Sequence, residues 1–305
     1  MSKKAVYLLG ILLTIILGTI LYCNLCTTCC VQEEIVAEPV VVEPKAATMN
    51  PFLLNDSNGD LKLNVNDNIN FKASGITILT PISSSVENAI DSLKVYLDAN
   101  PLKTIGITGL YTSEETNNSA FPNLGLARAN AVKNYYVSKG ISSQQIDTFG
   151  TLQDSMIPDQ DSVYYGPENY SISTRDESDN SHLDALQLIK DEIEANPLVM
   201  YFDTAKASIS LSAEQREKVA KISRYLDKVE GATTTIVGHT DNTGNADSNV
   251  VLGQERADFA KSYFIRNHIP ESKITTLSKG QTEPIADNDT EDGRAKNRRT
   301  IVILN

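Results

Sequence analysis

The N-terminal part of the chain carries a long, uninterrupted apolar run. Residues 5–22, AVYLLGILLTIILGTILY, contain no charged side chain and follow Lys3 and Lys4. About 20 apolar residues in a helix cross the ~30 Å hydrocarbon core of a bilayer. The alternative, a cleaved signal peptide, would have a shorter apolar core and small residues at its end, whereas this run ends in Leu21 and Tyr22. The pattern predicts a transmembrane helix, with residues 1–4 in the cytoplasm and the rest of the chain on the far side.

The C-terminal third of the chain alternates between strand and helix patterns. Residues 212–229 have apolar side chains at helical spacing, and Ser212 and Gln215 are placed to form a capping box. Residues 251–267 form a second apolar helical pattern. Short β-prone runs lie around these helices, at residues 198–203, 233–238, 274–278 and 300–304. Helices that alternate with strands predict an α/β sandwich of about 100 residues.

The middle of the chain repeats this C-terminal pattern. Residues 124–146, LGLARANAVKNYYVSKGISSQQI, align without a gap to residues 252–274, LGQERADFAKSYFIRNHIPESKI. A Tyr-Leu-Asp triplet precedes Gly109 and Gly238 by the same interval. Such self-similarity predicts tandem units of one fold. The predicted units are residues 52–176 and 196–305, joined by a helical connector over residues 177–195.

Residues 23–51 lie between the apolar run and the first unit. Two Glu-Pro steps without helical periodicity predict an extended linker over residues 31–50. The 4 cysteines of the chain lie just before that linker, at Cys23, Cys26, Cys29 and Cys30. Nothing nearby completes a zinc or cluster site, so we expect these thiols to pair with each other or between chains, which would give a homodimer. Metal binding and acylation are the alternatives.

Charge and motif content exclude several classes of function. The chain has 27 basic and 39 acidic residues and a net charge of −12, which argues against a nucleic-acid partner because phosphate binding needs a basic face. The sequence has no nucleophile elbow and no glycine-rich phosphate loop. His239 and Asp241 are spaced to share a metal, but His182 and His268 are far away in sequence. We therefore expect no enzyme activity, no cofactor and no metal site.

The candidate chemistry lies in residues 238–256, GHTDNTGNADSNVVLGQER, where Asp241 and Arg256 stand at the two ends of a strand–loop–helix step. This stretch, together with GQTEPIADN and GRAKNRRTIVI further on, resembles the C-terminal domain of the outer membrane protein A (OmpA) family. The family pattern is matched by residues 240–244, 249–257 and 293–299. One departure is Gly253, where the family usually has serine. The first unit resembles the family only in its helix and flanking strands.

The resemblance implies a fold, a ligand and a set of site residues. It implies two tandem βαβαβ sandwich domains with a mixed sheet and helices on one face, and non-covalent binding to peptidoglycan. Asp241 and Arg256 would be the ligand pair, with Thr240 beside them, Asn249 shaping the loop and Arg298 nearby. Many stem peptides carry diaminopimelate, whose free end presents an ammonium beside a carboxylate; aspartate suits the first group and the arginine fork suits the second.

We expect the Asp241 carboxylate and the Arg256 guanidinium to form an exposed pair with room for this zwitterion between them. Backbone amides of residues 242–245 and of a helix beginning near Val251 would bind the remaining ligand oxygens. The structural alternative is that Asp241 caps the turn and pairs with Arg256 to fix the loop.

Three expectations concern the whole protein. It is predicted to be anchored in a membrane of the cell envelope, inner or outer, with its domains in the periplasm. A structural envelope protein with an unused site is one alternative; a motor-stator subunit is another, disfavoured because residues 5–22 contain no acid to relay protons. The first unit is expected to be a silent copy, because Thr112 stands opposite Asp241, although Arg128 stands opposite Arg256.

Overall fold

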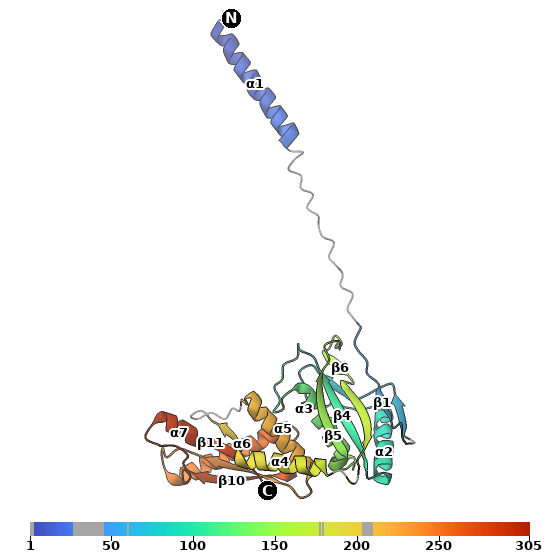
Figure 1. The fold of residues 1–305 in the computed structure, drawn as a ribbon. Helices are drawn as coiled ribbons and strands as arrows, with labels where there is room; N and C mark the ends of the chain where they lie inside the picture. The colour runs from blue at the N-terminus through green and yellow to red at the C-terminus, as the bar shows by residue number, and fades with distance from the viewer. Residues whose placement is uncertain (1–2, 27–45, 60, 177, 179, 203–209) are drawn as a thin grey trace. The chain divides into compact units, whose positions relative to one another are not determined.

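The computed structural model describes residues 3–26, 46–59, 61–176, 178, 180–202 and 210–305. The chain divides into two compact units, Met1–Lys45 and Ala46–Asn305. The first unit contains helix α1 (Lys3–Cys26), which includes the whole predicted span (Figure 1). Its length and composition are sufficient to cross a membrane. Of the four cysteines, Cys23 and Cys26 lie in α1, whereas Cys29 and Cys30 lie outside the described residues.

The C-terminal repeat is built on one mixed four-stranded sheet in the order β10–β9–β11–β8. Its strands are β8 (Leu198–Tyr201), β9 (Thr234–His239), β10 (Ile274–Gly280) and β11 (Arg299–Leu304). β10 runs parallel to β9, and β11 runs antiparallel to β9 and β8. Helix α6 (Ala246–Arg266) packs against β9, β10 and β11, and α5 (Ala213–Lys228) packs against β8. The predicted mixed α/β fold is confirmed.

The N-terminal repeat has the same central arrangement with fewer strands. β4 (Lys103–Tyr111) lies between β5 (Ile146–Leu152), which is parallel to it, and β7 (Glu168–Thr174), which is antiparallel. Helix α3 (Leu124–Ser138) packs on β4 and β5. The other elements are α2 (Ser84–Ala99) and the strand pairs β1–β2 and β3–β6, namely β1 (Phe52–Asn55), β2 (Lys62–Val65), β3 (Asn70–Lys72) and β6 (Val163–Tyr165). The sequence did not predict these four short strands.

One of the two predicted helices of the second repeat differs from its predicted start. The capping box of Ser212 and Gln215 forms as expected at the start of α5. α6, however, begins at Ala246 and not near Val251, because the Asn245 side chain accepts hydrogen bonds from the amides of the first turn. A further short helix, α7 (Glu291–Asn297), was not predicted, since its charged sequence has no apolar period.

In both repeats a glycine of the central strand touches a glycine of the following helix. A Cβ atom on Gly238 would lie 1.9 Å from the carbonyl oxygen of Gly253, and one on Gly109 would lie 2.0 Å from that of Gly125. Only glycine permits this approach. A Cβ on Gly253 would also lie 2.4 Å from the Ser278 hydroxyl oxygen.

The two repeats pack together within the unit Ala46–Asn305, with connector helix α4 (Ser181–Ala195) beside them (Figure 1). The ammonium of Lys133 in α3, 1% exposed, is paired with the carboxylate of Asp227 in α5. The Asn267 side chain accepts a hydrogen bond from the Ala120 amide at 2.7 Å, and that of Asn134 donates to the His268 carbonyl at 2.5 Å. Buried polar contacts of this kind hold the two repeats in one arrangement.

Candidate functional site

The candidate site lies just beyond the end of β9, where Thr240 and Asp241 continue the chain. The Thr240 amide donates to the Gly280 carbonyl at 2.9 Å, and the Thr240 hydroxyl donates to the Asp241 carbonyl at 2.9 Å. Both residues are buried, with exposed fractions of 3% and 9%. The parallel pairing of β9 and β10 thus continues into the loop and fixes the backbone of Asp241.

Two hydrogen bonds occupy part of the Asp241 carboxylate. Oδ1 accepts from the Thr243 amide at 3.0 Å, and Oδ2 accepts from Nη1 of Arg298 at 2.9 Å. Burial opposes ionisation of Asp241, but the bonds from Arg298 and Thr243 outweigh it, and the pKa of Asp241 is lowered. Asp241 is therefore an ionised, fixed carboxylate that retains acceptor capacity beyond these two bonds.

Arg298 supplies the ion pair that the sequence had suggested for Arg256. It follows α7, and its Nη2 also lies 2.8 Å from Oε1 of Glu291 in that helix. Burial opposes the charge of Arg298, but the bonds to Asp241 and Glu291 outweigh it and raise the pKa of the guanidinium. The structural alternative was thus right about the turn, since Asp241 caps it, and wrong about the partner. Arg298 is already neutralised by two carboxylates.

Asn249 connects the loop to α6. Its side-chain amide donates to the carbonyls of Asp241 and Thr243 at 3.3 and 3.1 Å, and to Oε1 of Gln281 at 2.6 Å. Asn249 lies in the first turn and a half of α6 and is 4% exposed. These bonds hold the loop backbone from Asp241 to Thr243, which agrees with the loop-shaping role that the family resemblance implies.

We expected Arg256 to be exposed. It lies instead on the buried side of α6 and is 7% exposed. Its Nη1 donates to the His239 carbonyl at 3.0 Å, and its guanidinium carbon lies 5.8 Å from the centroid of the Phe202 ring. Burial lowers the pKa of Arg256; the charge of Asp241 acts in the opposite direction. Among the described residues, no carboxylate lies within ion-pair distance of Arg256.

The equivalent arginine of the first repeat is neutralised by the chain itself. Nη1 of Arg128 donates to the Leu110 carbonyl at 2.8 Å. Leu110 aligns with His239, whose carbonyl accepts the corresponding bond from Arg256. In addition, both terminal nitrogens of Arg128 bind the Glu115 carboxylate, at 3.2 Å and 2.5 Å. Arg128 is completely buried. The sequence predicted an arginine without an acid at this site; that was wrong, because the acid comes from Glu115 and not from position 112.

The second repeat has glycine where the first has Glu115. With Gly109 aligned to Gly238, Glu115 falls opposite Gly244. Among the described residues, nothing lies within 4 Å of a Cβ atom placed on Gly244, whose φ is +95°. The second repeat therefore keeps the buried arginine but lacks the side chain that neutralises it in the first.

Two amides of the first turn of α6 are not free for ligand oxygens, contrary to expectation. The amides of Asp247 and Ser248 already donate to the Asn245 side chain, at 2.7 and 3.4 Å.

His239, the residue considered for metal binding, is 2% exposed, and burial together with the nearby Arg299 lowers its pKa to about 4. Within the described part of the chain, no three His, Cys, Asp or Glu side chains are grouped to hold a metal.

Thr240, Asp241, Asn249, Arg256 and Arg298 are thus brought together at one end of the sheet. The sequence analysis missed Phe202, Gln281 and Glu291, which contact them. Two of them had a signal in the sequence, since Gln281 lies in the stretch GQTEPIADN and Glu291 lies two residues before the motif that begins at Gly293. Phe202 had none, because only the folded chain brings it near.

Fold and site together define a small α/β binding domain with fixed opposite charges, present in one complete and one altered copy. The OmpA family profile matches residues 70–161 and 201–298, which is more than half of the 305 residues. The chain belongs to the OmpA family.

Individual relatives match one stretch of the chain. Outer membrane protein Omp38 of Acinetobacter baumannii is 36% identical over 108 residues, covering 35% of this chain and 30% of that protein. Peptidoglycan-binding protein ArfA of Mycobacterium tuberculosis is 38% identical over 87 residues, covering 28% and 27%. Outer-membrane lipoprotein YfiB of Pseudomonas aeruginosa is 34% identical over 94 residues, covering 31% and 56%. The match thus spans about a third of the first two relatives and about half of the third.

Proposed function

We propose that this protein binds peptidoglycan non-covalently through the diaminopimelate of the stem peptide and so tethers a cell-envelope membrane to the wall. Membership of the OmpA family supports a role at the wall, as does the similarity to a relative named as peptidoglycan-binding. The role is one of binding without catalysis, and it uses the second repeat.

The observation that carries the proposal is the buried guanidinium of Arg256 without a carboxylate partner among the described residues. Removing one partner from a buried ion pair is strongly unfavourable, because it leaves an uncompensated charge. The first repeat avoids this cost through Glu115. In the second repeat a carboxylate from the ligand would take the same place, and the arginine fork binds such a group through two parallel hydrogen bonds.

The other half of the ligand is recognised by Asp241. Its carboxylate is ionised, held by Arg298 and Thr243, and able to accept further hydrogen bonds. An ammonium carried on the same carbon as the ligand carboxylate would therefore meet an anion next to Arg256. Thr240 and Asn249 fix the loop, and Arg298 orients Asp241. The chemistry fits the free end of diaminopimelate.

Helix α1 would be the anchor, with both repeats in the periplasm. Its apolar length and the lysines at positions 3 and 4 support this topology. Mass spectrometry of the mature N-terminus tests it: a chain that begins after Tyr22 would contradict a retained span. A homodimer through the cysteine cluster remains a further proposal, which gel electrophoresis with and without reductant would test.

Co-sedimentation of the full chain, in detergent, with purified sacculi tests the proposed function. Asp241→Asn and Arg256→Gln should each weaken binding more than tenfold, because charge-assisted hydrogen bonds contribute about 1.5–3 kcal/mol each. Asp258→Asn, an exposed acid two residues from Arg256, is the matched control and should bind like the parent. Circular dichroism confirms that each variant is folded. Parent-like binding by both folded site variants would rule the site out.

A further inference from the structure

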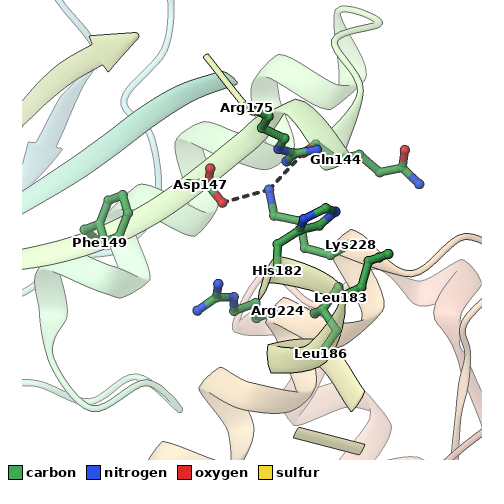
Figure 2. A pocket seen from close by; sticks show the side chains of 9 residues that line it. All are labelled: Gln144, Asp147, Phe149, Arg175, His182, Leu183, Leu186, Arg224 and Lys228. Carbon is green, nitrogen blue, oxygen red and sulfur yellow. Dashed lines mark hydrogen bonds and ion pairs between the residues drawn. The ribbon is translucent and has the colours of Figure 1, made fainter. Parts of the chain in front are cut away.

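A second region with binding character lies on the seam between the two repeats. Two hollows of about 420 Å³ each occur there, and both are lined by Arg224 of α5. Figure 2 shows the first, between β5 and the start of α4. The two hollows are neighbours that share Arg224 as a lining residue, and we call them together the seam groove.

The seam groove has an apolar lining that is open to solvent. Phe149 and Leu183 line the first hollow and are each 53% exposed, and Leu188 lines the second and is 68% exposed. Leu186 and Ile189 on α4 add to the same surface. Exposed apolar side chains that gather in a hollow are typical of a binding surface.

The side chains that line the groove carry a net positive charge, although the chain as a whole has a net charge of −12. Four basic side chains line it against one carboxylate, that of Asp147. Lys228 is neutralised, because its ammonium lies 2.9 Å from Oδ1 of Asp147 and donates to the Ile146 carbonyl at 2.6 Å. Arg175 donates to the Gln144 carbonyl (Figure 2), and Arg224 makes neither a hydrogen bond nor an ion pair with any described residue. Neither arginine has a carboxylate within ion-pair distance in the described part of the chain.

Burial lowers the pKa of the Lys228 ammonium; the Asp147 carboxylate opposes this effect, and the charge of Arg175 adds to it. An anion bound between the arginines would relieve this repulsion.

The groove also borders a strand edge whose backbone is not paired with a described strand. β5 is the outer strand in the order β5–β4–β7, so no described strand pairs with its far edge. Asp147 and Phe149 of β5 face the first hollow, whereas Thr148 faces the second. An edge strand is a template for an added peptide strand.

We propose that the seam groove binds an extended acidic peptide. Its carboxylates contact Arg224 and Arg175, its aliphatic side chains cover Phe149, Leu183 and Leu188, and its backbone runs along the edge of β5. Two neighbouring hollows beside one strand edge favour a peptide over a single small anion, and the net positive lining favours acidic over basic side chains. This site is separate from Asp241 and Arg256.

Fluorescence anisotropy with labelled heptapeptides tests the proposal on the full chain in detergent. A peptide of alternating valine and glutamate should bind, whereas one of alternating valine and lysine should not. Arg224→Ala and Phe149→Ser should each weaken binding at least tenfold. Arg266→Ala, an exposed arginine on α6 away from the groove, should have no effect. Thermal unfolding shows that the variants remain folded.

Three results would overturn the proposal: equal binding of both peptides, parent-like binding by Arg224→Ala, or displacement of the acidic peptide by octanoate at equal concentration. The last would mean a site for small amphipathic anions. Proline in place of the central valine removes a backbone donor and should weaken binding; unchanged affinity would contradict the role of β5.

Discussion

Arg128 and Arg256 occupy the same place in their repeats but have different electrostatic surroundings. Each donates to a strand carbonyl, of Leu110 and of His239. Only Arg128 has a carboxylate of its own chain, at Glu115. Its guanidinium also lies 5.6 and 5.5 Å from the centroids of two aromatic rings. The arginine of the first repeat is thus structural, whereas that of the second has no carboxylate partner among the described residues.

This difference predicts the effect of removing Glu115. Glu115→Gln should lower the free energy of unfolding by about 3–5 kcal/mol, because it leaves the buried Arg128 charge without a partner. Glu114→Gln, at the exposed neighbouring position, is the matched control and should change it by no more than about 0.5 kcal/mol. Urea unfolding of the full chain measures both. If Glu115→Gln lowers the free energy of unfolding no more than Glu114→Gln does, the ion pair with Glu115 is not what stabilises the buried Arg128.

His239 predicts a pH dependence in a defined window. Its pKa is lowered from 6.5 to about 4 in the folded protein, by burial first and then by Arg299. The unfolded chain therefore binds the proton first as the pH falls. The stability that neutral His239 contributes is complete above pH 6.5 and is lost between pH 6.5 and about 4.

The His239→Gln variant isolates this contribution. Urea unfolding at several pH values should show a slope of stability against pH that is smaller than the parent's by up to about 1.4 kcal/mol per pH unit. The difference is informative because other groups titrate alike in both proteins. His268, whose pKa burial lowers, acts in the same direction, and Glu168, whose pKa burial raises, acts in the opposite one. Identical slopes would contradict a buried neutral His239.

At the scale of secondary structure, the sequence predicted the elements that have a clear apolar period. α5, the strands of the second repeat and the connector helix were expected close to their observed bounds, and α6 was expected with a start five residues too late. The short strands β1, β2, β3 and β6 could not be predicted, because three or four residues give no period. The Asp241–Arg298 pair could not be predicted either, since it joins positions 57 residues apart through the approach of α7 to the loop.

The close contact between β9 and α6 predicts that a single methyl group added to a glycine there lowers the free energy of unfolding. Gly238→Ala should destabilise the protein by about 1–3 kcal/mol, because the new Cβ would meet a backbone carbonyl that cannot turn aside. Gly253→Ala should cost less, since its nearest contact is the Ser278 hydroxyl, which can rotate. Urea unfolding compares the two variants. Equal stability of Gly238→Ala and the parent would mean that the strand and helix are less closely packed than the structure shows.

At the scale of the molecule, the altered repeat is part of the structure that carries the site. Lys133 and Asp227 form an ion pair across the repeats, and the Arg216 side chain donates to the Ser119 carbonyl. His268 contacts the carbonyl of Ile76 at 2.9 Å. These contacts bury polar groups that would lose their partners if the repeats were separated, so binding is best measured on the complete chain.

The most direct test of the central claim compares two ligands that differ by one carboxylate. Isothermal titration calorimetry of the full chain in detergent would use a stem peptide with diaminopimelate and the same peptide with lysine, which keeps the ammonium. The parent should prefer diaminopimelate by about 10- to 150-fold, the equivalent of 1.5–3 kcal/mol for a charged hydrogen bond. Folded Arg256→Gln should bind both peptides equally weakly. Equal affinity of the parent for the two peptides, or a preference that survives in Arg256→Gln, would contradict the assignment of Arg256 as the receptor for the ligand carboxylate.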